Sequence, residues 1–138
     1  MFLLDTNIVS EWTKPKPSPR VVTWLDAQAE SSLFLSVITF AELRRGCALL
    51  TVGRKRDALT KWIDGPLTER FEGRLLQVDL AICDAWGDVM ARSRSRGREL
   101  SVMGGFIAAT ALAHGLSLVT RNTGDFADLE LALINPFG

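Results

Sequence analysis

Short apolar runs that alternate with helical stretches constrain the fold of this chain most strongly. None of these runs alternates between apolar and polar residues, so each is expected to form a strand buried on both faces. Such strands need helices on both sides of their sheet. The pattern therefore predicts an α/β protein, a three-layer α/β/α sandwich with a mainly parallel five-stranded sheet. The predicted strands cover residues 1–4, 33–36, 75–78, 116–119 and 131–134.

Helices are predicted between the strands from the spacing of apolar residues and from residues typical of helix ends. Pro19 opens one of these helices and Gly115 closes another, as is common at helix termini. The chain has no internal repeat, linker or low-complexity segment, so residues 1–138 are predicted to form one domain. The predicted helices cover residues 7–12, 19–28, 38–50, 57–64, 80–96 and 106–114.

Composition excludes several classes of function. The 16 basic residues balance the 16 acidic ones, so nucleic-acid binding would need a local basic patch. The single histidine, His114, cannot supply the histidine pair of an acid–base nuclease. The two cysteines, Cys47 and Cys83, are expected to be buried, reduced thiols. Without a signal peptide or an apolar run of membrane-spanning length, the chain is expected to be cytoplasmic, with no membrane partner.

Polar residues follow the first and fourth predicted strands, where open α/β sheets bind their ligands. These are residues 5–7 (DTN) and 120–126 (TRNTGDF). Helical spacing places Glu42 on a partly apolar face of helix 38–50. Taken alone, Asp5 is explained as a helix cap, Glu42 as a solvated or paired helix residue, and Asp125 as a turn former. Their placement along one edge of the sheet is the stronger signal.

A cluster of carboxylates at one edge favours a bound cation. Neighbouring carboxylates raise one another's pKa values, and a cation removes that cost. Mg²⁺ binds one or two carboxylates and keeps several waters, which leaves room for a phosphate. Since the chain has no histidine pair, these residues favour metal-assisted hydrolysis of a phosphodiester.

Four stretches together resemble PIN-domain ribonuclease toxins of the VapC and FitB type, from type II toxin–antitoxin systems. They are MFLLDTNIVSE, TFAELRRG, GGFIAATALAHG and LVTRNTGDF, and the likeness extends to the terminal NPFG. The resemblance implies a homodimeric α/β/α protein that cuts RNA with Mg²⁺ or Mn²⁺. It also implies a cognate antitoxin of the VapB or FitA type, through which the pair binds operator DNA.

The resemblance also assigns site residues. Asp5 and Glu42 match the first and second acids of the family, and the third acid falls at Gly104, where this chain has no side chain. The fourth position falls at Asn122 or nearer Asp125. Asp5, Glu42, Asn122 and Asp125 are therefore the predicted catalytic residues. The predicted metal ligands are Asp5, Glu42 and Asp125, with the ligand at position 104 missing.

Gly104 departs most clearly from the family pattern. A glycine is acceptable as the N-cap of the helix predicted over residues 106–114, but an aspartate caps at least as well. Stability therefore gives no reason for the glycine, and the nearby Glu99 is not expected to substitute for an acid here. We expect weak Mg²⁺ binding and poor RNA cleavage. The alternative is an inactive PIN-like module that acts by binding antitoxin or RNA.

Other polar residues near the predicted edge have two interpretations. Thr6 and Thr120 either hydrogen-bond a ligating carboxylate or water, or cap local turns. Arg121 is expected to hold a phosphate. The basic cluster at residues 53–56 (GRKR) is expected to be a solvated helix end, and the cluster at 92–98 (RSRSRGR) either a helix end or a contact for RNA.

Overall fold

The sheet is parallel throughout and has the strand order β3-β2-β1-β4-β5 in the computed structural model, which describes residues 1–138. Leu3 in the central strand pairs with Phe34 on one side and with Leu118 on the other. The predicted five-stranded sheet is confirmed. The strands are β1 (Phe2–Leu4), β2 (Leu33–Ser36), β3 (Leu75–Leu76), β4 (Ser117–Val119) and β5 (Leu133–Ile134).

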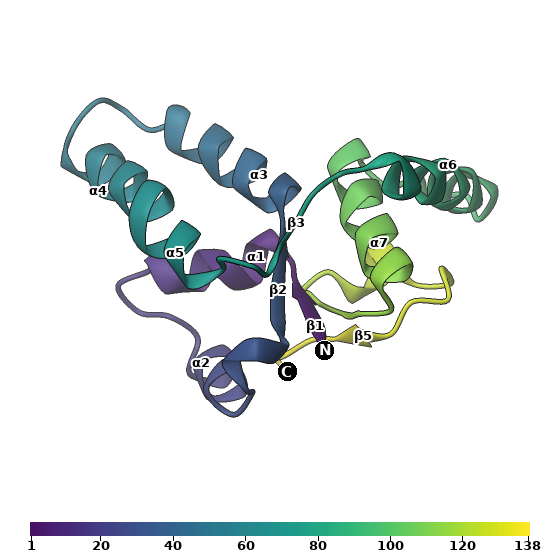
Figure 1. Ribbon diagram of the computed structural model, residues 1–138, viewed down its shortest axis with the longest axis horizontal. Helices are drawn as coiled ribbons and strands as arrows, with labels where there is room; N and C mark the ends of the chain where they lie inside the picture. Colours follow the sequence, from purple (N-terminus) through teal and green to yellow (C-terminus); the bar gives the residue numbers. More distant parts are fainter.

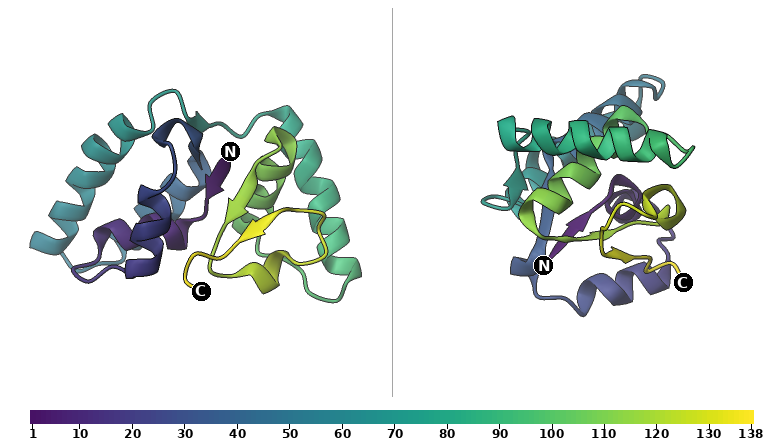
Figure 2. Two further views of the ribbon diagram at one scale, coloured as in Figure 1. Left: turned by 90° about the horizontal axis from the view of Figure 1, so that it is seen from below. Right: turned by 90° about the vertical axis from the view of Figure 1, so that its right-hand side faces the viewer.

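Helices cover both faces of this sheet, as the three-layer prediction requires. Helices α1 to α5 lie on one side of it, and α6 and α7 lie on the other (Figures 1 and 2). A π-helical turn, Ile63–Leu67, joins α4 to α5. The helices are α1 (Thr6–Val9), α2 (Pro19–Asp26), α3 (Val37–Ala48), α4 (Arg54–Trp62), α5 (Thr68–Arg70), α6 (Leu80–Ser95) and α7 (Val102–His114). None of them is long and apolar enough to cross a membrane.

Successive strand residues point into two separate hydrophobic cores. Leu4 and Val119 pack in the core beneath α1 to α5, whereas Leu3 and Leu118 pack in the core beneath α6 and α7. All four side chains are fully buried. This two-sided burial explains why the strands show no apolar–polar alternation in the sequence.

The direction of chain connection reverses between β1 and β4. Strands β2 and β3 lie on one side of this point, and β5 lies on the other. In open α/β sheets, ligands bind beyond the carboxyl ends of the strands at such a point. Asp5 and Thr120, which directly follow β1 and β4, are therefore held where a ligand is expected.

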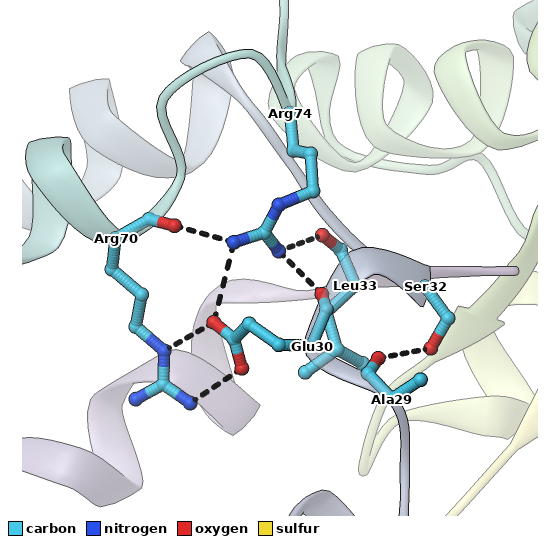
Figure 3. Close-up of polar contacts among 6 residues, drawn as sticks. All are labelled: Ala29, Glu30, Ser32, Leu33, Arg70 and Arg74. Atoms are coloured by element: carbon cyan, nitrogen blue, oxygen red, sulfur yellow. Dashed lines mark hydrogen bonds and ion pairs between the residues drawn. The ribbon is translucent and has the colours of Figure 1, made fainter.

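At the opposite, amino-terminal edge of the sheet, an arginine ties β2 to β3 (Figure 3). Arg74, just before β3, donates to the carbonyl oxygens of Glu30 and Leu33 at 2.6 Å each. Its side chain is only 16% exposed. Arg70 donates to the Glu30 carboxylate at 2.8 and 3.1 Å. This network lies at the edge of the sheet away from the predicted site. It stabilises the pairing of β2 with β3.

Several expectations about local structure are wrong. The strands predicted over residues 75–78 and 131–134 cover only Leu75–Leu76 and Leu133–Ile134. Helix α7 begins at Val102 instead of residue 106, because Ser101 caps it by accepting from the backbone N–H of Gly104 at 3.0 Å. Gly104 is therefore inside the first turn and is not the N-cap. Helix α4 begins at Arg54, so residues 54–56 form its first turn. Cys83 is exposed on α6, whereas Cys47 is buried as expected.

The other end of α7 agrees with the prediction. Gly115 follows the last helical residue with a φ of 65°, the left-handed conformation that glycine adopts without strain. His114 is the last residue of the helix and is exposed, away from the site edge.

Candidate active site

A polar cleft of about 500 Å³ opens beyond the carboxyl ends of β1 and β4. Only two of its 14 lining residues are hydrophobic. The cleft thus brings together every predicted catalytic residue and the glycine at the third acidic position. The lining residues are Asp5, Thr6, Asn7, Ser10, Glu42, Arg96, Arg98, Glu99, Leu100, Ser101, Gly104, Asn122, Asp125 and Phe126.

Asp5 links the end of β1 to the floor of the cleft. Its Oδ1 accepts from the backbone N–H of Thr6 at 2.8 Å, which caps α1. Its Oδ2 accepts from the Thr120 hydroxyl, also at 2.8 Å. Asp5 is therefore the helix cap that the sequence suggested, and the same contacts fix its carboxylate in the cleft, where it is 8% exposed.

Thr6 connects the first two acids. Its hydroxyl donates to Oε1 of Glu42 at 2.7 Å, which joins the start of α1 to the middle of α3. Glu42 is half-buried and forms no ion pair with Arg45. The expected pairing with Arg45 is therefore wrong, and the fold turns this half-buried carboxylate toward Thr6.

Both carboxyl groups are harder to ionise than usual. Burial raises the pKa of Asp5 above its ordinary value, the charge of Asp125 adds to the rise, and hydrogen bonds from Thr120, Thr6 and Asn7 only partly oppose it. Burial likewise raises the pKa of Glu42, and the negative charge of Asp5 adds to the effect. Two carboxylates without a basic partner, in a water-accessible cleft, form a site that a cation would stabilise.

Thr120 and Asn7 hold this part of the site together. The Thr120 hydroxyl donates to Asp5 and accepts from the backbone N–H of Asn122 at 3.0 Å, so it both orients a carboxylate and caps a local turn. Asn7 donates from Nδ2 to Thr120 at 3.3 Å and accepts on Oδ1 from the backbone N–H of Arg121 at 3.1 Å. Asn7 was not predicted as a site residue, although its place in DTN was the available signal.

The residues after β4 separate into different environments. Asn122 lines the cleft beside Thr120. Asp125 also lines it, but its carboxylate accepts from Nη2 of Arg98 at 3.1 Å. The guanidinium of Arg121 lies 3.8 Å from the centre of the Phe137 ring, and Arg121 is not among the lining residues. The structure therefore does not bring Arg121 to the acidic cluster.

The two neighbouring glycines of α7 have different surroundings. A Cβ at Gly105 would collide with Met90 and Trp86 of α6, so close packing of the two helices requires a glycine there. A Cβ at Gly104 would meet only Ser101 Oγ closely, at 2.9 Å, with Leu100 next at 3.7 Å. Gly104 faces the cleft. Packing therefore explains Gly105, whereas a side chain at Gly104 would have to displace only the Ser101 hydroxyl.

The cleft also contains charged residues that were not predicted with a defined role. Arg96, Arg98 and Glu99 reach it from the connection between α6 and α7. The sequence marked residues 92–98 only as a basic cluster with two interpretations. No three acidic, histidine or cysteine side chains of the chain converge closely enough to form a metal site by themselves.

Comparisons with known proteins identify the family. Residues 2–130 match the PIN domain family. The chain is 42% identical to the plasmid stability protein StbB of Pseudomonas syringae pv. tomato and 39% identical to toxin FitB of Neisseria gonorrhoeae, each over 99% of both chains. It superposes with a TM-score of 0.93 on a solved structure described as FitAB bound to IR36 DNA fragment, with 38% identity over 100% of this chain and 96% of that chain. The chain belongs to the PIN-domain family, as a toxin of the FitB and VapC type from a toxin–antitoxin system.

Proposed function

We propose that this chain, as one PIN domain over residues 1–138, is a metal-dependent endoribonuclease whose activity is impaired at Gly104. The observation that carries the proposal is the meeting of two carboxylates with raised pKa values, Asp5 and Glu42, through Thr6 in a polar cleft. Relatives support the reaction class. The VapC ribonuclease Y4jK of Sinorhizobium fredii is 39% identical over 99% of this chain, and ribonuclease VapC4 of Mycobacterium tuberculosis is 32% identical over 72% of it.

The residues present suit Mg²⁺ or Mn²⁺. Both ions prefer oxygen ligands, and Mg²⁺ is commonly held by one or two carboxylates together with water. Asp5 and Glu42 would be the ligands, with Asn122 as the fourth site residue. A bound ion would supply an activated water and stabilise charge on the phosphodiester. Thr120 and Thr6 contribute by holding the two carboxylates in fixed orientations.

Gly104 leaves the proposed site one carboxylate short. An aspartate at this position would enter the cleft from the first turn of α7, where the helix dipole favours a negative charge. Since no three acidic side chains converge in this chain, we expect weak metal binding and slow RNA cleavage. The Gly104→Asp variant is the form expected to be active.

The test is cleavage of total RNA by the unmodified chain, Gly104→Asp and Gly104→Asn. Asparagine matches the shape of aspartate without its charge and is therefore the control. We expect rapid cleavage by Gly104→Asp alone, in Mg²⁺ and not in EDTA. Equal cleavage by the unmodified chain and Gly104→Asp would overturn the proposed role of Gly104.

A second candidate function is a binding module without catalysis, which the missing third acid favours. In this case Gly104→Asp would fold and bind RNA or an antitoxin, yet would not cut RNA at any Mg²⁺ concentration. The same cleavage assay therefore separates the two functions.

The proposal includes the partners implied by the family. We propose that the chain forms a homodimer in the cytoplasm, binds an antitoxin of the VapB or FitA type, and reaches operator DNA only through that antitoxin. The similar FitAB structure, described as bound to a DNA fragment, supports this arrangement. Light scattering on the purified toxin, alone and co-expressed with its antitoxin, would test the two assemblies.

A further inference from the structure

The cleft needs a source of positive charge if it is to hold RNA. Four carboxylates and two arginines line it, and the chain as a whole has no net charge. RNA carries one negative charge per nucleotide, so local cations must supply the attraction. The two arginines of the cleft are Arg96 and Arg98.

Arg96 is committed to the protein backbone. Its guanidinium donates to the carbonyl oxygens of Ala127 and Asp125 and fixes the turn after β4 to the end of α6. These contacts hold Asp125 in place beside the cleft. They use one N–H of each terminal nitrogen and tie the Arg96 side chain to this turn, so Arg96 serves a structural role.

Arg98 is available to a ligand. Its side chain is 62% exposed, and its one ion-pair partner is Asp125, which is 54% exposed. An ion pair between two exposed groups is weak and exchanges readily. The guanidinium can instead donate two parallel hydrogen bonds to a phosphate.

The backbone around Arg98 is well anchored. Its N–H donates to the carbonyl oxygen of Ser93 at 3.2 Å, and the N–H of Leu100 donates to the Ser93 hydroxyl at 3.1 Å. Ser93 itself is fully buried. The side chain of Arg98 is thus presented from a fixed loop at the rim of the cleft.

We propose that Arg98 binds a phosphate of a single-stranded RNA substrate and that Asp125 holds Arg98 in position until the RNA replaces it. The inference rests on the proposed ribonuclease function, because it specifies how the substrate of that site is bound. It assigns Asp125 to positioning, while Asp5 and Glu42 remain the proposed metal ligands. The other basic candidate, Arg121, stacks on Phe137 outside the cleft.

The test is the affinity for a fluorescein-labelled, single-stranded oligoribonucleotide, measured by fluorescence anisotropy in EDTA at low salt. Without metal no cleavage is expected, so binding is measured separately from catalysis. The variants are Arg98→Gln, Asp125→Asn and Arg94→Gln. Arg94 is the matched control, because it is an exposed arginine of the same cluster that does not line the cleft.

Arg98→Gln is expected to weaken binding about tenfold, the effect of losing one charge-assisted contact. The slope of log affinity against log salt should fall by about 0.7, as for one phosphate contact on a single strand. Arg94→Gln should change affinity less than twofold. Asp125→Asn should bind as tightly as the unmodified chain or more tightly, since it frees Arg98 and removes a negative charge.

Several outcomes would overturn the proposal. One is equal weakening by Arg98→Gln and Asp125→Asn, which would mean that the ion pair acts only on structure. Others are equal weakening by Arg98→Gln and Arg94→Gln, absence of RNA binding by the unmodified chain, and preference for the matching DNA strand. The proposed function fails separately, if Gly104→Asp does not cut RNA in Mg²⁺.

Discussion

A single substitution at Gly104 should make the stability of this protein depend on Mg²⁺. Without metal, the new Cβ of Gly104→Asp would push Ser101 Oγ aside, because they would lie 2.9 Å apart. Weakening this cap costs up to about 1 kcal/mol. Replacing a helical glycine and placing a carboxylate in the first turn each contribute about 0.5 kcal/mol in return. Repulsion between the new carboxylate and those of Asp5 and Glu42 also lowers the free energy of unfolding. In EDTA, Gly104→Asp is therefore expected to be about as stable as the unmodified chain.

Bound Mg²⁺ should make Gly104→Asp more stable than the unmodified chain. Binding at a concentration a hundred times the dissociation constant stabilises the folded state by about 2.7 kcal/mol. For a chain of this length, that raises Tm by roughly 10 °C. The measurement is thermal unfolding of the unmodified chain, Gly104→Asp and Gly104→Asn, each in EDTA and in excess Mg²⁺. Equal Mg²⁺-induced Tm shifts for all three proteins, or no shift for Gly104→Asp at saturation, would contradict the assignment of a missing metal ligand to position 104.

Three further predictions concern the stability of the unmodified site and of two packing positions. Because the pKa values of Asp5 and Glu42 are raised, the folded state binds their protons more tightly than the unfolded state. These two groups should therefore add stability as pH falls from neutral toward their ordinary pKa range, and excess Mg²⁺ should oppose this contribution. Comparing urea unfolding with and without Mg²⁺ separates it from the opposite contribution of Glu11 and Glu30, whose pKa values are lowered. Arg74→Ala should cost about 2 kcal/mol, because it removes charge-assisted hydrogen bonds to the carbonyl oxygens of Glu30 and Leu33 from a side chain that is only 16% exposed, whereas the exposed Arg70→Ala should cost less than about 1 kcal/mol; urea unfolding of both variants measures the difference. Gly105→Ala should destabilise the chain by about 1–3 kcal/mol through overpacking against α6, which thermal unfolding would detect as a lower Tm.

Most of the sheet could be predicted from the sequence, because a strand buried on both faces consists of apolar residues without apolar–polar alternation. Leu33 to Ser36 contains no alternation and forms β2 with the predicted bounds. The start of α7 could not be predicted in the same way. Val102 and Met103 are exposed apolar residues in its first turn, so helical periodicity does not reveal them. The cap at Ser101 decides where this helix begins.

The two acids of the site were predictable to different degrees. Asp5 directly follows a buried strand, and this position alone places it at the ligand-binding edge. Glu42 is one acid among several on helices, and its role depends on the hydroxyl of Thr6, which is 36 residues away in the sequence. Only the parallel packing of β1 beside β2 makes that contact.

The arginines of the basic run at residues 92–98 show what the sequence pattern cannot specify. Arg94, Arg96 and Arg98 are alternate residues in one basic run, yet they have three different environments. Arg96 binds backbone carbonyls, Arg98 pairs with Asp125, and Arg94 does not line the cleft. These differences depend on the loop that leads from α6 to α7 and on the turn after β4.

The proposed metal site is tested most directly by a crystal structure of Gly104→Asp with Mn²⁺, analysed by the anomalous scattering of the metal. We expect one metal peak bound by the carboxylates at positions 5, 42 and 104, with Asp125 still paired to Arg98. A fully occupied ion bound by Asp125 instead, or no peak in this cleft at saturating Mn²⁺, would contradict the assignment of the missing ligand to position 104.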